Sequence, residues 1–109
     1  MKYFNPIAEI ESAEIIKGFH GKFVHTNDMT IAYWTVEAGA ELPEHHHIHE
    51  QITNLMSGEF EMTVGEETKI CKPGDVVAIP SNVVHKGRAL TDCEIIDIFQ
   101  PARPEYQNK

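Results

Sequence analysis

Short segments in which apolar and polar residues alternate make up much of the chain, and turn residues separate them. In residues 59–64, Phe60, Met62 and Val64 share one face, whereas acidic residues and threonine occupy the other. This two-residue period is typical of an antiparallel strand with one buried face. Residues 30–36 are β-branched and aromatic and predict a second strand.

Further strands are predicted later in the chain. Residues 51–56 form one, and residues 68–72 form a hairpin with the preceding strand across a turn at residues 65–67. Residues 75–79 and 94–99 are largely apolar runs that a nearby proline ends. A set of about seven or more short strands predicts an all-β domain, either a β-sandwich or a closed barrel.

Two other segments have a clear local pattern. Residues 72–75 have the sequence Lys-Pro-Gly-Asp. This predicts a type II turn, because glycine accepts the positive φ required at the second corner. Residues 7–16 have weak amphipathic character, and the glycines at 18 and 21 argue against a long helix. We expect an arm or an edge strand there.

Length and composition indicate one soluble globular domain over residues 1–109. The chain is 41% hydrophobic and 24% charged, and its net charge of −8 argues against nucleic acid and anionic membranes as partners. It lacks a run long enough to span a bilayer and opens without a leader pattern, so we expect a cytoplasmic protein. Cys71 and Cys93 are isolated and predicted to be buried, unpaired residues.

Histidines are concentrated in residues 45–51, His-His-His-Ile-His-Glu-Gln, and another follows at His85. Alternate residues of an extended strand share a face, so His45, His47 and Gln51 can point the same way. Neutral imidazoles are the commonest metal ligands in proteins, and an amide oxygen can complete the set. We therefore predict that these four side chains bind one divalent metal ion. The alternative is a polar loop without a ligand.

The residues around these histidines resemble the two motifs of the cupin superfamily. The matching residues are Gly39, His45, His47, Gln51 and Gly58 in the first motif and Gly74, Pro80 and His85 in the second. The resemblance covers about residues 39–99 and implies a double-stranded β-helix, the jelly-roll barrel of RmlC-like cupins. Three positions depart from the family pattern. Gln51 replaces a glutamate, Asn82 a glycine and Ala89 an asparagine.

The glutamine changes the chemistry expected of the metal. Three imidazoles and an amide carry no negative charge, so a bound divalent ion keeps its full charge. This favours a Lewis acid that polarises a carbonyl or binds a carboxylate, and it disfavours oxygen chemistry that requires a higher oxidation state. Four protein ligands leave one or two positions for water or substrate on an octahedral ion. Manganese, iron, nickel and zinc are all candidates.

Residues 97–103, Asp-Ile-Phe-Gln-Pro-Ala-Arg, resemble the ending of a small cupin family from pectin and alginate breakdown. Those enzymes convert ring-form 4,5-unsaturated monouronates into the linear keto acid and hold their metal with three histidines and a glutamine. The resemblance implies that Asp97 and Arg103 are catalytic, that Arg103 binds substrate and that Phe99 shapes the pocket. An arginine can bind a carboxylate with two hydrogen bonds, and Asp97 can transfer protons if burial raises its pKa.

Other functions remain open on the same scaffold. They include a metal-dependent dioxygenase, an isomerase of another sugar or keto acid, and a non-catalytic module that binds a small molecule. The expected partners are a small acidic substrate and a second copy of the chain, because small cupins commonly form homodimers.

Individual residues also have structural alternatives. Arg103 is alternatively a surface cation, and Asp97 a carboxylate paired with a backbone donor. His46 has the opposite parity to the ligands and is expected in solvent. His49 shares their parity and is a candidate for orienting a ligand. His25, outside the motifs, is expected to be an ordinary polar group of the surface or core.

Overall fold

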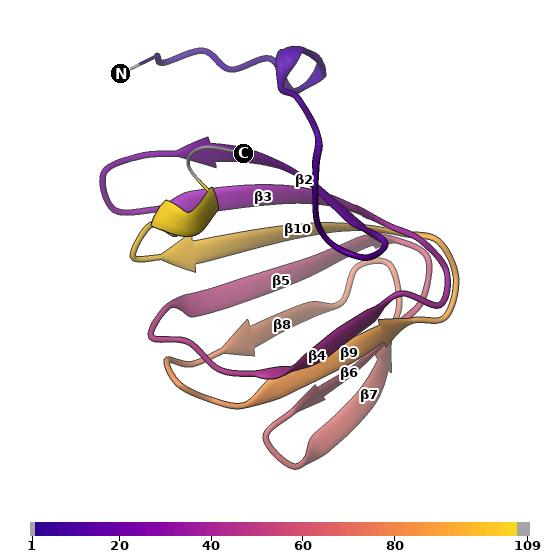
Figure 1. Cartoon of the computed structure of the whole chain (residues 1–109). Helices are drawn as coiled ribbons and strands as arrows, with labels where there is room; N and C mark the ends of the chain where they lie inside the picture. The colour runs from indigo at the N-terminus through magenta and orange to yellow at the C-terminus, as the bar shows by residue number, and fades with distance from the viewer. Residues whose placement is uncertain (1, 107–109) are drawn as a thin grey trace.

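The computed structural model describes residues 2–106, which form ten strands in two antiparallel sheets (Figure 1). The six-stranded sheet has the order β1-β2-β3-β10-β5-β8, and the four-stranded sheet has the order β4-β9-β6-β7. The strands are β1 (Ala13–Ile16), β2 (Phe19–His25), β3 (Thr30–Val36), β4 (Glu41–His45), β5 (Glu50–Ser57), β6 (Phe60–Val64), β7 (Glu67–Cys71), β8 (Val76–Ile79), β9 (His85–Ala89) and β10 (Cys93–Gln100). The expected all-β jelly roll is confirmed as a sandwich, whose pairings among the described residues do not join the sheets into a closed barrel.

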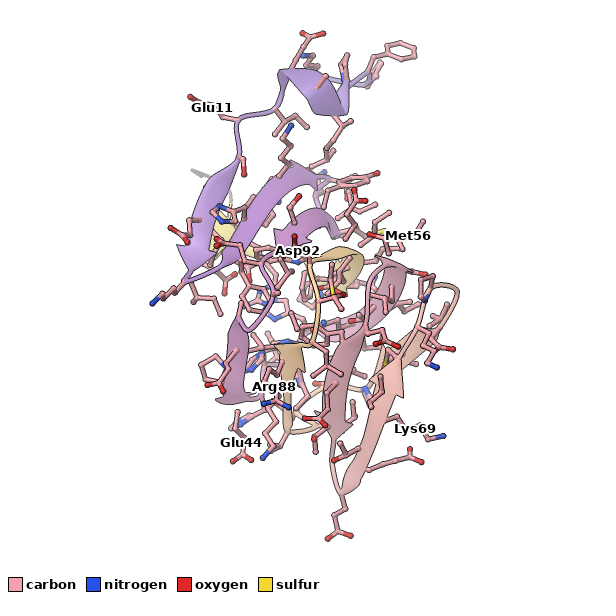
Figure 2. The ribbon with its side chains drawn as sticks, turned by 90° about the vertical axis from the view of Figure 1, so that its right-hand side faces the viewer. Glu11, Glu44, Met56, Lys69, Arg88 and Asp92 are labelled. Atoms are coloured by element: carbon pink, nitrogen blue, oxygen red, sulfur yellow. The ribbon has the colours of Figure 1, made fainter. Side chains whose placement is uncertain are left out.

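Apolar side chains from both sheets fill the space between them. Phe19 of β2 meets Phe60 of β6 edge to face, with ring centroids 6.3 Å apart. Charged side chains such as Glu44, Lys69 and Arg88 project away from the four-stranded sheet (Figure 2). Burial of each large apolar side chain contributes roughly 1.5–3 kcal/mol, so this shared core holds the two sheets together.

Two rows of paired, inward-facing residues cross the six-stranded sheet and carry most of the polar groups discussed below. The first row runs from β2 to β8 through His25, Thr30, Phe99, Gln51 and Ile79. The second row runs through Phe23, Ala32, Asp97, Thr53 and Val77. Residues two apart along a strand face the same side, so the two rows present their side chains together to the interior.

The strands predicted from alternation are present, and the predicted features at residues 7–16 and 72–75 are found. Residues 7–16 contain a short 3-10 turn, η1 (Ile7–Glu9), followed by the edge strand β1. At the Lys-Pro-Gly-Asp turn, Gly74 has a φ of 96° and the Asp75 N–H donates to the Lys72 carbonyl at 2.9 Å. Both cysteines are buried and unpaired, as expected. None of the helical segments in residues 2–106 has the length and apolar composition needed to cross a membrane.

Candidate functional site

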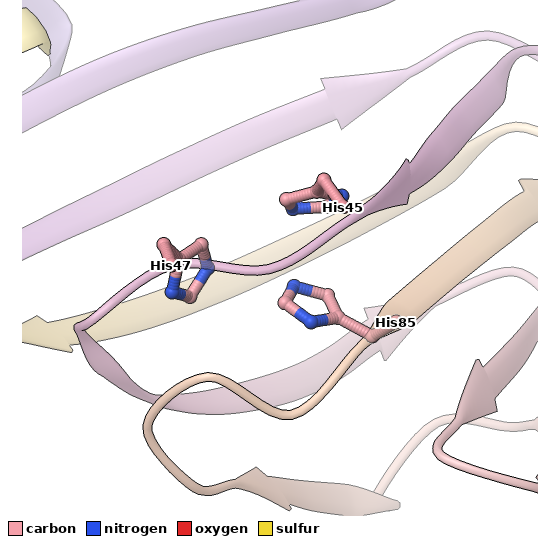
Figure 3. Close-up of side chains that lie close together, drawn as sticks. All are labelled: His45, His47 and His85. Carbon is pink, nitrogen blue, oxygen red and sulfur yellow. The ribbon is translucent and has the colours of Figure 1, made fainter.

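Three of the predicted metal ligands lie together between the sheets. His45, at the end of β4, pairs with His85 at the start of β9, and His47 lies in the loop that leads to β5. One ring nitrogen from each histidine lies within 4.8 Å of one from each of the others. The three rings surround a common space (Figure 3), so they are able to hold one metal ion.

Hydrogen bonds to the main chain set the tautomer of all three rings. Each Nδ1 lies 2.8–3.0 Å from the backbone carbonyl oxygen of a residue two positions away, and the acceptors belong to Pro43, His49 and Val83. A carbonyl oxygen only accepts, so each Nδ1 carries the hydrogen and each Nε2 keeps a lone pair. Within residues 2–106 the buried Nε2 of His85 has no hydrogen-bond partner. This arrangement fits metal coordination.

Gln51 approaches this group from the opposite sheet. Its Oε1 lies 3.0 Å from Nε2 of His47, and its amide nitrogen donates to Oγ1 of Thr53 at 2.9 Å. The Nε2 lone pair therefore faces the lone pairs of an amide oxygen, which is repulsive unless a cation lies between them. Two ligand atoms at right angles, each about 2.1 Å from an ion, lie about 3.0 Å apart. The spacing of this pair fits a shared metal ion.

The parity argument for these residues is wrong, although the residues do come together. His45 belongs to the four-stranded sheet and Gln51 to the six-stranded sheet, so they do not lie on one strand. The loop at residues 46–49 crosses from one sheet to the other and places the ring of His47 between them. His46 is exposed, as predicted. The backbone carbonyl of His49 orients His47, while the buried His49 ring lies against Phe99 at 6.4 Å.

Burial favours the neutral form of two histidines of the site, His85 and His47. Loss of solvation lowers the pKa of His85 from 6.5 to about 4. Burial, followed by the positive charge of Arg103, also lowers the pKa of His47. Only a neutral imidazole can offer a lone pair to a metal, so these shifts favour metal binding at neutral pH.

Asp97 lies on β10 in the second row and is buried. The indole N–H of Trp34 donates to its Oδ2 at 3.0 Å, and Oδ1 has no hydrogen-bond partner in the described part of the chain. Burial raises the pKa of Asp97 from 3.8 to about 6, although Thr53, Trp34, Gln51 and Arg103 partly oppose the shift. A carboxyl group with this pKa can both accept and donate a proton near neutral pH. In residues 2–106 the donor is an indole, and the alternative of a backbone partner is not found there.

Arg103 is not a free surface cation, because its side chain is only 13% exposed. Its guanidinium carbon lies 4.8 Å from the ring centroid of Phe99 and 4.6 Å from that of Tyr106. Nη2 donates to Glu105 at 3.2 Å, and Nε is buried without a partner among residues 2–106. The guanidinium thus lies against two aromatic rings and keeps hydrogen-bonding capacity unused.

A cavity of about 250 Å³ connects these groups. Its polar lining comprises His45, Gln51, Thr53, Asp97 and Arg103. Its apolar lining includes Phe19, Phe60, Met62, Phe99 and Tyr106. The cavity therefore brings two of the predicted metal ligands, both predicted catalytic residues and Phe99 to one space, large enough for a small molecule.

Three residues of the site were not predicted to take part in it: Trp34, Thr53 and Tyr106. Trp34 lies in an aromatic and β-branched strand pattern that is typical of a core, and the short 3-10 turn η2 (Pro104–Tyr106) that carries Tyr106 has no distinctive pattern. Thr53 did carry a signal. It follows Gln51 by two residues on the same strand, so two polar residues share the inward face of β5.

The fold and the site together define a class, the small two-sheet jelly rolls that gather histidine and amide side chains between their sheets. Residues 32–99 match the family model described as the cupin domain, and the chain belongs to the cupin family. At the family's usual glycine position, Asn82 adopts the glycine-like φ of 63°, which asparagine tolerates better than most residues.

Similar proteins support a closer relationship within the family. The pectin degradation protein KdgF of Dickeya dadantii is 28% identical over 96 residues, covering 85% of this chain and 87% of that protein. The solved structure of KdgF from Halomonas sp. is 29% identical with a TM-score of 0.90, covering 96% of this chain and 98% of that one. An RmlC-like cupin from Shewanella frigidimarina is 26% identical with a TM-score of 0.92, covering 97% and 96%. The resemblance to pectin-degradation cupins and the RmlC-like fold are thus confirmed.

Proposed function

We propose that the protein is an enzyme that uses a divalent metal ion as a Lewis acid on a small sugar acid or keto acid. The most specific form of the proposal is the conversion of 4,5-unsaturated monouronates into the linear keto sugar acid. The observation that carries it is one cavity lined by His45, Gln51, the buried Asp97 and Arg103, with His47 and His85 grouped around His45. The similarity to two KdgF proteins supports the same substrate class.

His45, His47, Gln51 and His85 would hold the metal ion. Bound there, a divalent ion supplies an electrophile for oxygen atoms of the substrate. Because the four donors are neutral, the ion would retain its charge and favour an anionic ligand. Manganese, iron, nickel and zinc all accept such nitrogen and oxygen donors.

Arg103 and Asp97 have different roles, carboxylate binding and proton transfer. The guanidinium of Arg103 binds the substrate carboxylate, which a chain of net charge −8 would otherwise repel. Opening of the ring removes a proton from the C1 hydroxyl, breaks the bond between C1 and the ring oxygen, and adds a proton at C4. The products are an aldehyde at C1 and a ketone at C5, with no net gain or loss of atoms. Asp97 moves these protons in this proposal, which its raised pKa of about 6 supports in both directions.

The direct test follows the ultraviolet absorbance of the conjugated double bond when metal-loaded protein is incubated with an unsaturated monouronate. We expect the absorbance to fall well above the rate of a no-enzyme control, and chelation of the metal should stop the loss. Absorbance that follows the control would disprove this substrate. Oxygen uptake with a panel of phenolic and keto acids would instead indicate a dioxygenase.

We further propose that the active form is a homodimer. Large apolar side chains are exposed on the outer face of the six-stranded sheet, including Ile52 at 45%, Met56 at 54% and Val76 at 61%. Neighbouring exposed apolar residues of this kind are typical of interaction surfaces. Light scattering after size exclusion should give twice the mass of the chain, and Ile52→Glu should reduce it to a single chain.

A further inference from the structure

The C-terminal turn that carries Arg103 is attached to the sheet through a buried threonine. The Arg103 backbone N–H donates to Oγ1 of Thr30 at 2.8 Å. Thr30 is fully buried, although a hydroxyl group gains nothing from burial unless it is hydrogen-bonded. The position of Arg103 therefore depends on a side chain of the first row of the six-stranded sheet.

His25 extends this attachment by a second bond. Its Nε2 lies 3.3 Å from the backbone carbonyl of Tyr106, and its Nδ1 lies 2.8 Å from Oγ1 of Thr30. Since a carbonyl oxygen only accepts, Nε2 carries the hydrogen of that bond, and Nδ1 is the acceptor in the bond to Thr30. The Thr30 hydroxyl then donates to His25 and accepts from Arg103. Each of these three hydrogen bonds has one donor and one acceptor. Together they bind both ends of the turn, Arg103 and Tyr106.

The sheet makes this attachment rigid. His25 and Thr30 are direct cross-strand partners in β2 and β3, and Thr30 pairs on its other side with Phe99. The Phe23 ring stacks on that of Tyr106, with centroids 4.5 Å apart and an angle of 18°. Side chains supported by regular sheet hold a group more accurately than a free loop does.

We propose that Thr30 and His25 are positioning residues that hold the C-terminal turn, and with it the Arg103 guanidinium, against the cavity. Neither side chain lines the cavity, so both act through Arg103. Their effect on catalysis rests on the proposed function, in which Arg103 binds the substrate carboxylate. Their effect on the turn itself does not.

The first experiment measures hydrogen exchange of the Arg103 amide by NMR in metal-loaded protein. Thr30→Val keeps the shape of the side chain but removes both bonds, and we expect the amide to exchange at least tenfold faster. Thr30→Ser keeps the hydroxyl and should match the wild type, as should Thr35→Val on the outer face of the same strand. His25→Asn, which loses the bond to Tyr106, serves as a second variant if Thr30→Val folds poorly. Unchanged exchange in Thr30→Val or His25→Asn would overturn the proposal.

The second experiment measures turnover of an unsaturated monouronate. A carboxylate contact that is equally strong in ground and transition states affects KM rather than kcat. We expect Thr30→Val to raise KM about tenfold, with kcat changed less than about twofold and metal content unchanged. In an Arg103→Gln background Thr30→Val should have no further effect on KM. A full additional effect there would show a general structural role and overturn the proposal, whereas an inactive wild type would disprove the proposed function and leave the exchange experiment to decide.

Discussion

The two ends of the space between the sheets are built from the same strands but differ in chemistry. At one end, inward-facing positions of β3, β5 and β10 carry Val36, Leu55 and Cys93, all of which are apolar and at most 3% exposed. At the other end, the same strands carry Thr30, the pair Gln51 and Thr53, and Asp97. The buried polar atoms without partners in residues 2–106 all belong to this second, polar end or the residues around it: His49 Nδ1, His85 Nε2, Asp97 Oδ1 and Arg103 Nε.

This difference separates stability from chemistry within one small core. A buried polar atom without a partner costs about 1–3 kcal/mol, so the polar end destabilises the fold, and the apolar end has to compensate. Groups that are costly and unpaired are those available to a metal ion or a substrate. Substitutions at the polar end should therefore reduce metal affinity or activity, whereas substitutions at the apolar end should reduce stability.

The largest expected effect comes from removal of a metal ligand at the polar end. His47→Ala deletes the nitrogen that shares the space with His45, His85 and Gln51. We expect metal affinity to fall more than about 100-fold, since loss of an outer-shell partner alone typically costs 10–100-fold. Activity should be lost with the metal. Elemental analysis of the purified protein measures the occupancy.

The neighbouring His46 provides the matched control for that experiment. It is exposed and lies one residue from His47 in the same loop. His46→Ala should retain both metal and activity. Equal metal content in His46→Ala and His47→Ala would show that the four side chains are not the ligands.

Asp97→Asn should abolish proton transfer while leaving the metal in place. The asparagine side chain can still accept the Trp34 N–H bond, but it cannot exchange protons near neutral pH. Positioned acid–base groups contribute roughly 10²–10⁴-fold to rate, and kcat should fall by that factor. Turnover of the monouronate measures it at equal metal occupancy. A kcat within a few-fold of the wild type would assign the proton transfer to another group.

At the apolar end we expect a loss of stability without a loss of metal affinity or activity. Leu55→Ala removes a side chain that is 3% exposed and contributes nothing to the lining of the cavity. Such substitutions lower the free energy of unfolding by about 2–5 kcal/mol. Metal affinity and kcat of the folded fraction should stay at wild-type values. Urea denaturation gives the first quantity, and a coupled loss of metal affinity would show that the two ends are not separable.

The stability of the metal-free protein should depend on pH in opposite directions through two buried groups. The pKa of Asp97 is raised from 3.8 to about 6, so between these values the folded state binds more protons and becomes less stable as pH rises. The pKa of His85 is lowered from 6.5 to about 4, so the folded state there binds fewer protons and becomes more stable as pH rises. The two effects oppose each other over most of the same interval.

Asp97→Asn separates these contributions. One pKa unit corresponds to about 1.4 kcal/mol, so this variant should exceed the wild type in stability by about 3 kcal/mol near pH 7. The advantage should shrink as the pH falls from about 6 and vanish below about 4. Urea titrations of chelator-treated protein across this range measure it. A difference that is independent of pH would contradict the buried charge as its cause.

Sequence pattern predicted the strands in which apolar inward positions follow one another without interruption, and it missed β2, β4 and β9. In β2 and β9 one inward position is glycine, Gly21 and Gly87 respectively. A Cβ at Gly21 would lie 2.5 Å from the Phe23 ring, and one at Gly87 would lie 2.2 Å from the Phe60 ring. Rings from neighbouring residues occupy the space that an apolar side chain normally fills, so alternation is lost from the sequence although the strand is present.

The candidate ligands could be predicted because their spacing is a property of the chain, whereas the groups that support them depend on strand register. Asp97 meets Trp34 across the pairing of β10 with β3, and Thr30 meets Arg103 only after the chain turns back. The spacing of residues along the sequence does not reveal these two contacts. Gln51 and Thr53 are the exception, because their hydrogen bond lies within one strand.

Loss of the hydrogen bond between Gln51 and Thr53 gives the smallest expected effect. It also separates structure from chemistry most finely. The Thr53 oxygen accepts from the Gln51 amide at 2.9 Å and thereby directs Oε1 toward His47. Thr53→Val keeps the volume but allows the amide to rotate, and we expect metal affinity to fall about tenfold, the lower range for an outer-shell partner. Thr53→Ser should preserve it. Competition with a chelator resolves a difference of this size. Equal metal affinity in Thr53→Val and Thr53→Ser would show that Gln51 is not a ligand and would leave three histidines. An amide that is free to turn would in that case contribute nothing to metal binding.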